Sequence, residues 1–210
     1  FTGPANTPEQ GATDSWRYCA VSAGNGHLIN FGCHYIDTSR MMLGADPVSV
    51  SGHVGNRMSQ GVIPEDHYVI AALCEPDLTI TIAQYGTPAS YRTPSSGYVI
   101  FGATGMIEAT GHSGGVLLSA AGEETREVAP DAQLLAASAW DREHRGFFRS
   151  IIDDAPEPVT GEDAMKNIEW AAAAYLSSER GCRVELPLCA QDCAYCGPCL
   201  EETLPPSGGE

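Results

Sequence analysis

The sequence predicts an α+β fold, with an open, mostly antiparallel sheet and helices packed on one face. Short segments of alternating or β-branched residues follow one another closely from residue 48 to residue 119. This short spacing favours antiparallel pairing, because parallel partners need long crossover connections. Helical patterns lie only before and after this β-rich region. Helix, strands and then further helices is the element order of an α+β domain.

The first helix is predicted over residues 31–43, where the apolar residues roughly fit one packed side. Gly44 and Pro47 end it, since both residues disfavour continuation. Residues 1–15 come before it, are rich in Gly, Pro and Thr, and lack periodicity, so we expect a loop there. Residues 16–23 are predicted to form a short strand or a turn that approaches a glycine-rich turn.

The strands of the central region are bounded by Gly, Pro and other turn residues. Strict alternation over residues 78–85 places Leu78, Ile80 and Ile82 on one face. The preceding link, residues 74–77, has the length of a hairpin connection. Short strands are predicted at residues 48–51, 67–73, 78–85, 97–101, 105–110 and 116–119.

Helical patterns close the predicted domain. One helix is expected over residues 131–154, with Asp131 as its N-cap. Thr160 opens the next one, because Asp163 follows it at the spacing of an approximate capping box, and Gly181 ends that helix after about Glu179. Residues 183–186 read as a last short strand. The main domain is thus predicted over residues 16–188, followed by a Cys-rich flexible tail over residues 189–210.

The charge balance narrows the classes of partner. A formal net charge of −16 over 210 residues argues against nucleic acid and against an anionic membrane surface. No apolar run approaches the ~20 residues of a membrane-spanning helix. A neutral or weakly charged small substrate fits better, held by local cations such as Arg17, Arg40 or Arg57. Residues 1–14 show no signal peptide, so we expect a cytoplasmic protein and interpret the chain as a fragment.

Polar residues recur at fixed offsets after the glycine turn. Asn30, His34 and Asp37 are spaced i, i+4 and i+7, so they share one face of a helix. An imidazole beside an amide and a carboxylate suits proton transfer, because an ordinary imidazole titrates near pH ~6.5. The alternatives are that His34 packs or caps, that Asn30 is a helix N-cap, and that Asp37 is a surface charge rather than an orienter of His34.

The stretch Gly-Asn-Gly-His-Leu-Ile-Asn-Phe-Gly-Cys-His-Tyr-Ile-Asp at residues 24–37 resembles the catalytic helix of a known family. This is the Gfo/Idh/MocA family of nicotinamide-dependent sugar and polyol oxidoreductases. Its pattern there is a glycine turn, an apolar pair, Asp or sometimes Asn, and then Gly-x-His-x-Ile-Asp. Residues 65–68, 97–105 and 158–178 are similar to later segments of its C-terminal domain. The resemblance covers about residues 16–188 and implies the substrate-side domain.

The resemblance also implies roles for individual residues. His34 matches a histidine that, with a lysine from the nucleotide-binding half, flanks the substrate hydroxyl during hydride transfer. Asn30 and Asp37 join it as catalytic candidates, although Asn30 stands where the family most often has Asp. Trp16 and Arg17 match a pair that reaches the substrate, with ordinary packing as the alternative for Trp16. The expected activity is NAD- or NADP-dependent oxidation or reduction at a secondary alcohol of a sugar or polyol.

The features of a cofactor-binding half are missing from the sequence. No G-x-G-x-x-G follows a strand, and no Glu-Lys-Pro motif supplies the family's catalytic lysine. The only lysine is Lys166, on the last predicted helix. Because hydride transfer needs a bound and oriented nicotinamide, we predict that this chain alone is inactive. Its expected partners are a Rossmann domain, the small substrate and further copies of the chain, joined through the exposed face of the sheet.

The tail has a chemistry of its own. Thiolates crowded as C-x3-C-x2-C-x2-C could bind zinc or hold an iron–sulfur cluster. The alternative is a disordered or disulfide-linked tail. A second hypothesis for the whole chain is therefore a non-enzymatic dimerisation or binding module with a metal-binding tail. The candidate ligands are Cys189, Cys193, Cys196 and Cys199.

Overall fold

The computed structural model describes residues 2–6, 23–57, 65–87, 97–110, 115–132 and 136–189. The chain divides into two compact units. The first combines Phe1–Pro94 with Met165–Glu210, and the second is Ser95–Ala164. Both combine paired strands with helices, so the predicted α+β class is confirmed.

The sheet of the first unit runs in the order β1-β4-β3-β2-β9. Antiparallel pairing joins all of these neighbours except β1, which runs parallel to β4. Cys74 pairs with Leu78 at the end of the β3–β4 hairpin, which confirms the predicted short link. The strands are β1 (Thr2–Asn6), β2 (Pro47–Gly55), β3 (His67–Cys74), β4 (Leu78–Thr87) and β9 (Val184–Glu185).

The expectation of a loop over residues 1–15 is wrong for Thr2–Asn6, which form β1. Backbone pairing with β4 holds this strand, from Thr2 opposite Ala83 to Asn6 opposite Thr87. Such pairing needs no alternation of side chains, so the Gly- and Pro-rich sequence concealed it.

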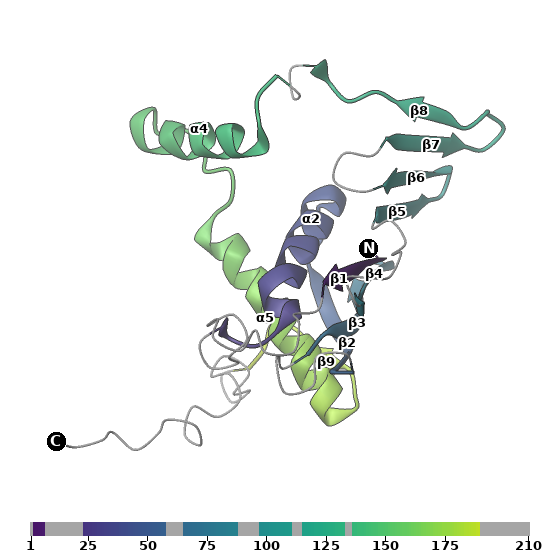
Figure 1. Ribbon diagram of the computed structural model, residues 1–210, viewed down its shortest axis with the longest axis vertical. Coiled ribbons are helices and arrows are strands. Elements are labelled where there is room, and N and C mark those ends of the chain that lie inside the picture. Colours follow the sequence, from purple (N-terminus) through teal and green to yellow (C-terminus); the bar gives the residue numbers. More distant parts are fainter. Residues whose placement is uncertain are drawn as a thin grey trace. The chain divides into compact units, whose positions relative to one another are not determined.

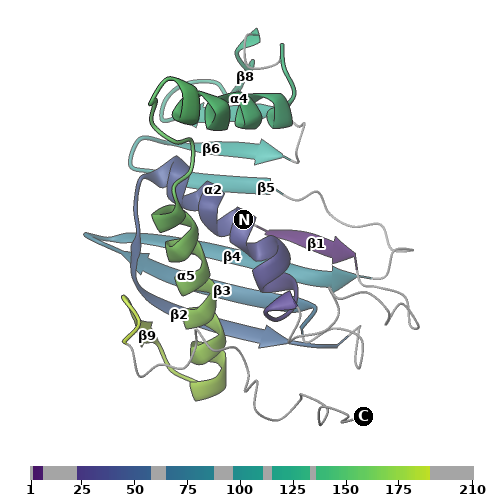
Figure 2. The same ribbon diagram turned by 90° about the vertical axis from the view of Figure 1, so that its left-hand side faces the viewer.

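One face of this sheet is covered by the helices of the unit, as Figures 1 and 2 show. A π-helical turn, η2 (Leu28–Gly32), runs directly into α2 (Cys33–Leu43), which Gly44 ends at a φ of +61°. The second helix is α5 (Gly161–Arg180). Between helices and sheet lies the core, whose largest fully buried apolar side chains are Trp170, Tyr68, Leu28, Ile36, Ile70, Ile82 and Val50.

Small residues let α5 lie very close to β2. A Cβ on Gly52 would lie 2.6 Å from the Ala174 carbonyl oxygen. The Gly52 N–H donates to Ser177 Oγ at 2.9 Å, and the Val54 N–H donates to Ser178 Oγ at 3.0 Å. The serines of α5 therefore satisfy backbone groups of β2 beyond its short pairing with β9.

The second unit is an antiparallel meander followed by a helix. Its elements are β5 (Gly97–Gly102), β6 (Gly105–Thr110), β7 (Val116–Ala120), β8 (Arg126–Val128) and α4 (Ala139–Ile152). Ala132 is helical, as the predicted start at Asp131 requires, but the prediction of one helix over residues 131–154 is wrong, because residues 136–138 are not helical and α4 begins only after Ser138. Ser138 and Asp141 form a reciprocal capping box, which fixes this start.

The predicted start and end of α5 are confirmed. The Asp163 N–H donates to Thr160 Oγ1 at 3.1 Å, and the Thr160 N–H donates to Asp163 Oδ2 at 3.3 Å. Gly181, at a φ of +65°, follows the last residue of the helix. This positive φ suits glycine, which lacks the Cβ that strains other residues there.

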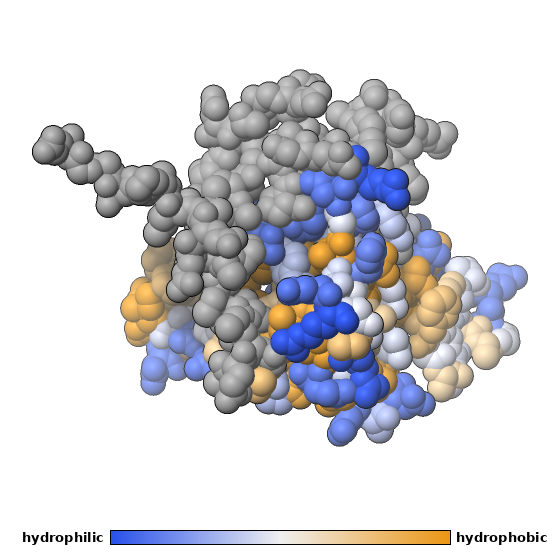
Figure 3. Space-filling view, turned by 90° about the horizontal axis from the view of Figure 1, so that it is seen from below, coloured by the Kyte–Doolittle hydropathy of each residue, from blue (hydrophilic) through white to orange (hydrophobic). Residues whose placement is uncertain are grey.

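Among the helices that the structure describes, none is both long and apolar enough to cross a membrane. On the face seen in Figure 3, hydrophobic and hydrophilic residues are interspersed over the described part of the surface.

Candidate functional site

The glycine turn leads the chain into the helix that carries the predicted site. Gly24 and Asn25 have φ values of +75° and +130°, a region that glycine adopts freely and asparagine tolerates better than most residues. The turn passes directly into η2, a rare geometry that is frequent at functional sites. The turn and η2 together therefore determine the position and direction of α2, the helix that follows.

Asn30 lies within η2 and is tied to the glycine turn. Its backbone N–H and its side-chain amide both donate to the Gly26 carbonyl oxygen, at 3.1 and 3.2 Å. The N-cap of η2 is His27, so the alternative in which Asn30 is the N-cap is wrong. Asn30 instead holds the turn closed over the start of the helix.

His34 lies exposed in the first turn of α2. Its backbone carbonyl accepts a hydrogen bond from Thr38 Oγ1 at 2.8 Å. Its imidazole has no hydrogen-bond partner within the described part of the chain. Among the described residues, no neighbour engages this imidazole as it would a packing or capping histidine.

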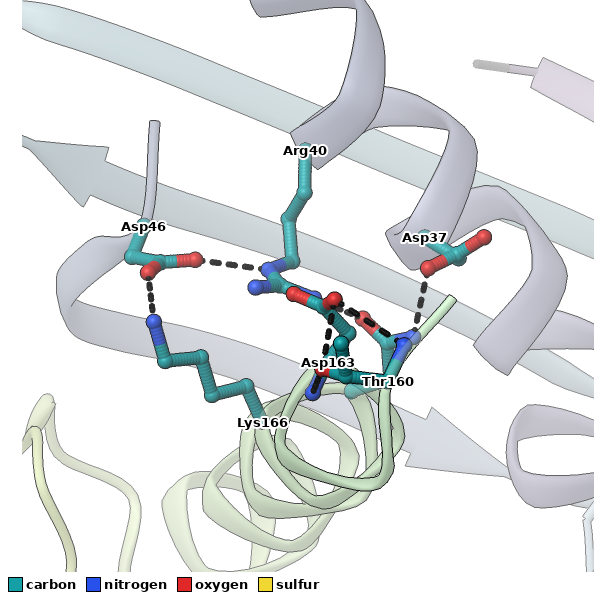
Figure 4. A network of polar contacts seen from close by, with 7 residues as sticks. Asp37, Arg40, Asp46, Thr160, Asp163 and Lys166 are labelled. Atoms are coloured by element: carbon teal, nitrogen blue, oxygen red, sulfur yellow. Dashed lines mark hydrogen bonds and ion pairs between the residues drawn. The ribbon is translucent and has the colours of Figure 1, made fainter. Parts of the chain in front are cut away.

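Asp37 is engaged with α5. Its Oδ1 accepts a hydrogen bond of 2.8 Å from Asn167 Nδ2, and no hydrogen bond joins it to His34 among the described residues. Asn167 Oδ1 in turn accepts from Arg40 Nη1 at 2.7 Å. Asp37 therefore belongs to a network that joins α2 to α5 (Figure 4).

The same network engages Arg40, which sequence reasoning offered as a cation for substrate. Arg40 is only 9% exposed, and its Nε donates to Asp46 Oδ1 at 2.7 Å. Asp46 also forms an ion pair with Lys166 (Figure 4). Burial by itself would raise the pKa of Asp46, but the hydrogen bonds from Lys166 and Arg40 outweigh it and lower that pKa. Arg40 is thus a structural cation.

Close packing explains why residue 32, within the segment 24–37, is a glycine. A Cβ on Gly32 would lie 2.6 Å from Leu28 Cδ1 and 2.8 Å from the Tyr68 hydroxyl oxygen. Tyr68 is fully buried and donates to Gln84 Oε1 at 2.6 Å. Only a residue without a side chain lets the helix approach the sheet here.

Sequence reasoning missed Glu65, which lies under the glycine turn. The residue is 3% exposed, and its Oε1 accepts hydrogen bonds from the Leu28 N–H at 2.9 Å and the Tyr175 hydroxyl at 2.5 Å. Burial raises its pKa, although these hydrogen bonds oppose the shift. Burial and the nearby Glu65 carboxylate raise the pKa of Tyr175 well above its ordinary value. The available signal was a pair of acidic residues, Glu65 and Asp66, placed directly before the apolar strand β3.

Several predicted site residues lie outside the described residues, namely Trp16, Arg17, Cys193, Cys196 and Cys199. Cys189 is described and exposed. Within the described ranges, no group of three His, Cys, Asp or Glu residues is placed to hold a metal ion. The metal site in the tail stays a prediction.

Comparisons with known proteins identify the domain. A family model described as the oxidoreductase family, C-terminal alpha/beta domain, matches residues 2–186. It is the C-terminal model of the Gfo/Idh/MocA group. A search of curated proteins gave no match.

Solved structures share the fold at low sequence identity. The aldose-aldose oxidoreductase from Caulobacter crescentus, complexed with glycerol, superposes with a TM-score of 0.72 at 20% identity, over 88% of this chain and 54% of that one. A levoglucosan dehydrogenase in complex with NADH and levoglucosan gives 0.72 at 16%, over 90% and 58%. The WlbA dehydrogenase from Bordetella pertussis, with NADH and UDP-GlcNAcA, gives 0.66 at 18%, over 90% and 54%. The chain therefore spans little more than half of these proteins.

Proposed function

Because the chain belongs to the Gfo/Idh/MocA oxidoreductase family through its C-terminal domain, we propose that it is the substrate-side half of a nicotinamide-dependent dehydrogenase. The proposed substrate is a sugar or polyol with a reactive secondary alcohol. The observation that carries the proposal is His34, an exposed imidazole without a hydrogen-bond partner in the described part of the chain, on the helix that follows the glycine turn.

The start of η2 does not fit the phosphates of a dinucleotide. The helix start after the glycine turn is the natural place for a phosphate, but the buried Glu65 carboxylate fills it. We therefore assign cofactor binding mainly to a separate nucleotide-binding domain. When bound, a nicotinamide supplies hydride chemistry, and this chain handles the substrate and its proton.

In this proposal His34 takes the proton of the substrate hydroxyl at an imidazole nitrogen, or returns it in the reverse direction. Asn30 has its amide N–H committed to Gly26, while its Oδ1 can accept a hydrogen bond from a sugar hydroxyl. Asp37 supports the site indirectly, because its bond to Asn167 helps hold α2 against α5. Trp16 and Arg17 remain predicted substrate contacts.

The test compares variants in the assembled enzyme, meaning this chain together with its nucleotide-binding domain. His34→Asn should lower kcat by about 10²–10⁴-fold, the usual contribution of a general acid–base group, while substrate affinity is retained. His144→Asn is the matched control, since His144 is exposed on α4 and its ring contacts Trp140. Unchanged turnover in the His34 variant would rule out proton transfer by this residue.

Self-association through the sheet also remains a proposal. Its support is a set of exposed apolar side chains on β5 and β6, of which Phe101 is 79% exposed and Val99 47%. Substitution of Phe101 by Asp should shift the mass measured by light scattering toward the single chain. An unchanged mass would place any subunit interface elsewhere.

The metal-binding module is the second candidate, since the family match supports the oxidoreductase domain. If the tail binds metal, zinc or iron should co-purify with the chain and be lost when Cys193 and Cys196 are changed to Ser.

A further inference from the structure

The start of η2 receives its cap from another segment of the chain. The first backbone N–H groups of a helix have no intrahelical partner, and a buried start must satisfy them otherwise. The N-cap residue His27 makes no side-chain capping hydrogen bond. The N–H of the fully buried Leu28 instead donates to Glu65 Oε1 at 2.9 Å, across 37 residues of sequence.

The same oxygen joins α5 to this helix start. The Tyr175 hydroxyl donates to Glu65 Oε1 at 2.5 Å, across 110 residues of sequence. The start of η2, the segment before β3 and the helix α5 thus meet at one carboxylate oxygen. A negative group is stabilised at the N-terminal end of a helix, so the Glu65 carboxylate has the position of a bound anion.

The other carboxylate oxygen shows how closely the turn is fitted to this side chain. Glu65 Oε2 is buried and has no hydrogen-bond partner among the described residues. It lies against Gly26, where an added Cβ would collide with it. Gly26 also provides the carbonyl that binds both the backbone and the side chain of Asn30. A displacement of Glu65 would therefore be transmitted to Asn30 through one residue.

We propose that Glu65 is a positioning residue, whose carboxylate anchors the glycine turn and the start of η2 to α5 and thereby sets the placement of Asn30 and His34. Removing its side chain should leave a site that a small carboxylate can fill, because the Leu28 N–H and the Tyr175 hydroxyl remain as donors. The expected loss of kcat rests on the proposed function, whereas the expected change in the position of the turn does not.

The structural test uses the full chain and nuclear magnetic resonance. In Glu65→Ala the Leu28 amide should exchange faster with solvent, and the His34 imidazole signals should shift. Sodium formate should reverse both changes, while sodium chloride at equal ionic strength should not. Glu65→Gln should behave like the unchanged chain, because its amide oxygen can accept both hydrogen bonds.

Glu169→Ala is the matched control. Glu169 is another carboxylate that accepts a distant backbone N–H, that of Leu188 at 2.8 Å, and it lies on the same helix as Tyr175. Its removal should affect neither the Leu28 amide nor the His34 signals, and formate should have no effect. Tyr175→Phe removes only one donor to Glu65, so it should change the Leu28 exchange rate and the His34 signals in the same direction but by less. This variant provides the test if Glu65→Ala does not fold.

The kinetic arm uses the assembled enzyme. Glu65→Ala should lower kcat by about 10–10²-fold with a smaller change in KM, because a small misplacement of a reacting group is costly, and formate should restore part of the loss. An unchanged Leu28 amide and unchanged His34 signals in Glu65→Ala would overturn the inference. If those signals respond as expected while His34→Asn keeps full turnover, the anchoring of the turn stands and the proposed function fails.

Discussion

The Asp37 carboxylate accepts a hydrogen bond of 2.8 Å from the Asn167 side-chain amide. The two residues lie 130 positions apart in sequence, so this bond connects the predicted catalytic helix to α5. Because Asn167 also accepts from the buried Arg40, Asp37 contributes to helix docking. Because the Asp37 carboxylate binds Asn167, we do not assign it a part in the proton transfer proposed for His34.

Asp37→Ala should therefore lower the free energy of unfolding by about 1 kcal/mol, the net value of one hydrogen bond. Asp37→Asn should cost less, because the amide oxygen can still accept from Asn167. Denaturant unfolding of the chain measures both. In the assembled enzyme, a loss of kcat in Asp37→Asn as large as that of His34→Asn would show that Asp37 does act on the imidazole.

The two cations around Asp46 should differ in their contribution to stability. Arg40→Ala should lower the free energy of unfolding by about 2–3 kcal/mol, because it removes hydrogen bonds of a buried charged group and leaves Asn167 without a donor. Lys166→Ala should cost less than about 1 kcal/mol, since both partners of that ion pair are nearly half exposed. Equal losses in denaturant unfolding would contradict this ranking.

Gly26→Ala should destabilise the chain by about 1–3 kcal/mol through overpacking against Glu65. Gly161→Ala is the control, because a Cβ there meets no atom within 4 Å. The cost at Gly26 should shrink in the Glu65→Ala background, where the colliding side chain is gone. Additive losses in this double-mutant cycle would show that the two residues do not interact.

Stability should depend on pH through Glu65. Burial raises the pKa of its carboxyl in the folded chain, so this group favours folding below its ordinary pKa and loses that contribution as pH rises through the raised value. Asp46, whose pKa is lowered, contributes in the opposite direction. Glu65→Gln should therefore gain stability relative to the unchanged chain as pH rises through this window. A pH-independent difference in unfolding free energy would contradict the raised pKa.

Local patterns were sufficient for much of the fold. Alternation marked β4, whose neighbour β3 buries Tyr68, Ile70, Ala72 and Cys74 in turn. Thr160, Asp163 and Gly181 marked the ends of α5, because capping depends on residues near in sequence. Both signals act within a few residues, so one sequence can reveal them.

The features that the sequence did not predict depend on contacts between residues far apart in sequence. The strand β1 depends on pairing with β4, about 80 residues away, and the sequence of β1 carries no sign of it. Glu65 acquires its role through Leu28 and Tyr175, at separations of 37 and 110 residues. Asp37 was expected beside His34 from helical spacing, which says nothing about a competing partner on another helix. Tertiary contacts decided each of these cases.

The most direct test of the central claim is the turnover of His34→Ala in the assembled enzyme, measured with and without added imidazole. If His34 transfers the proton, kcat should fall by about 10²–10⁴-fold, and imidazole should restore part of it with the pH dependence of its own titration. Full turnover without imidazole would contradict the account, since the proton would then leave by another route.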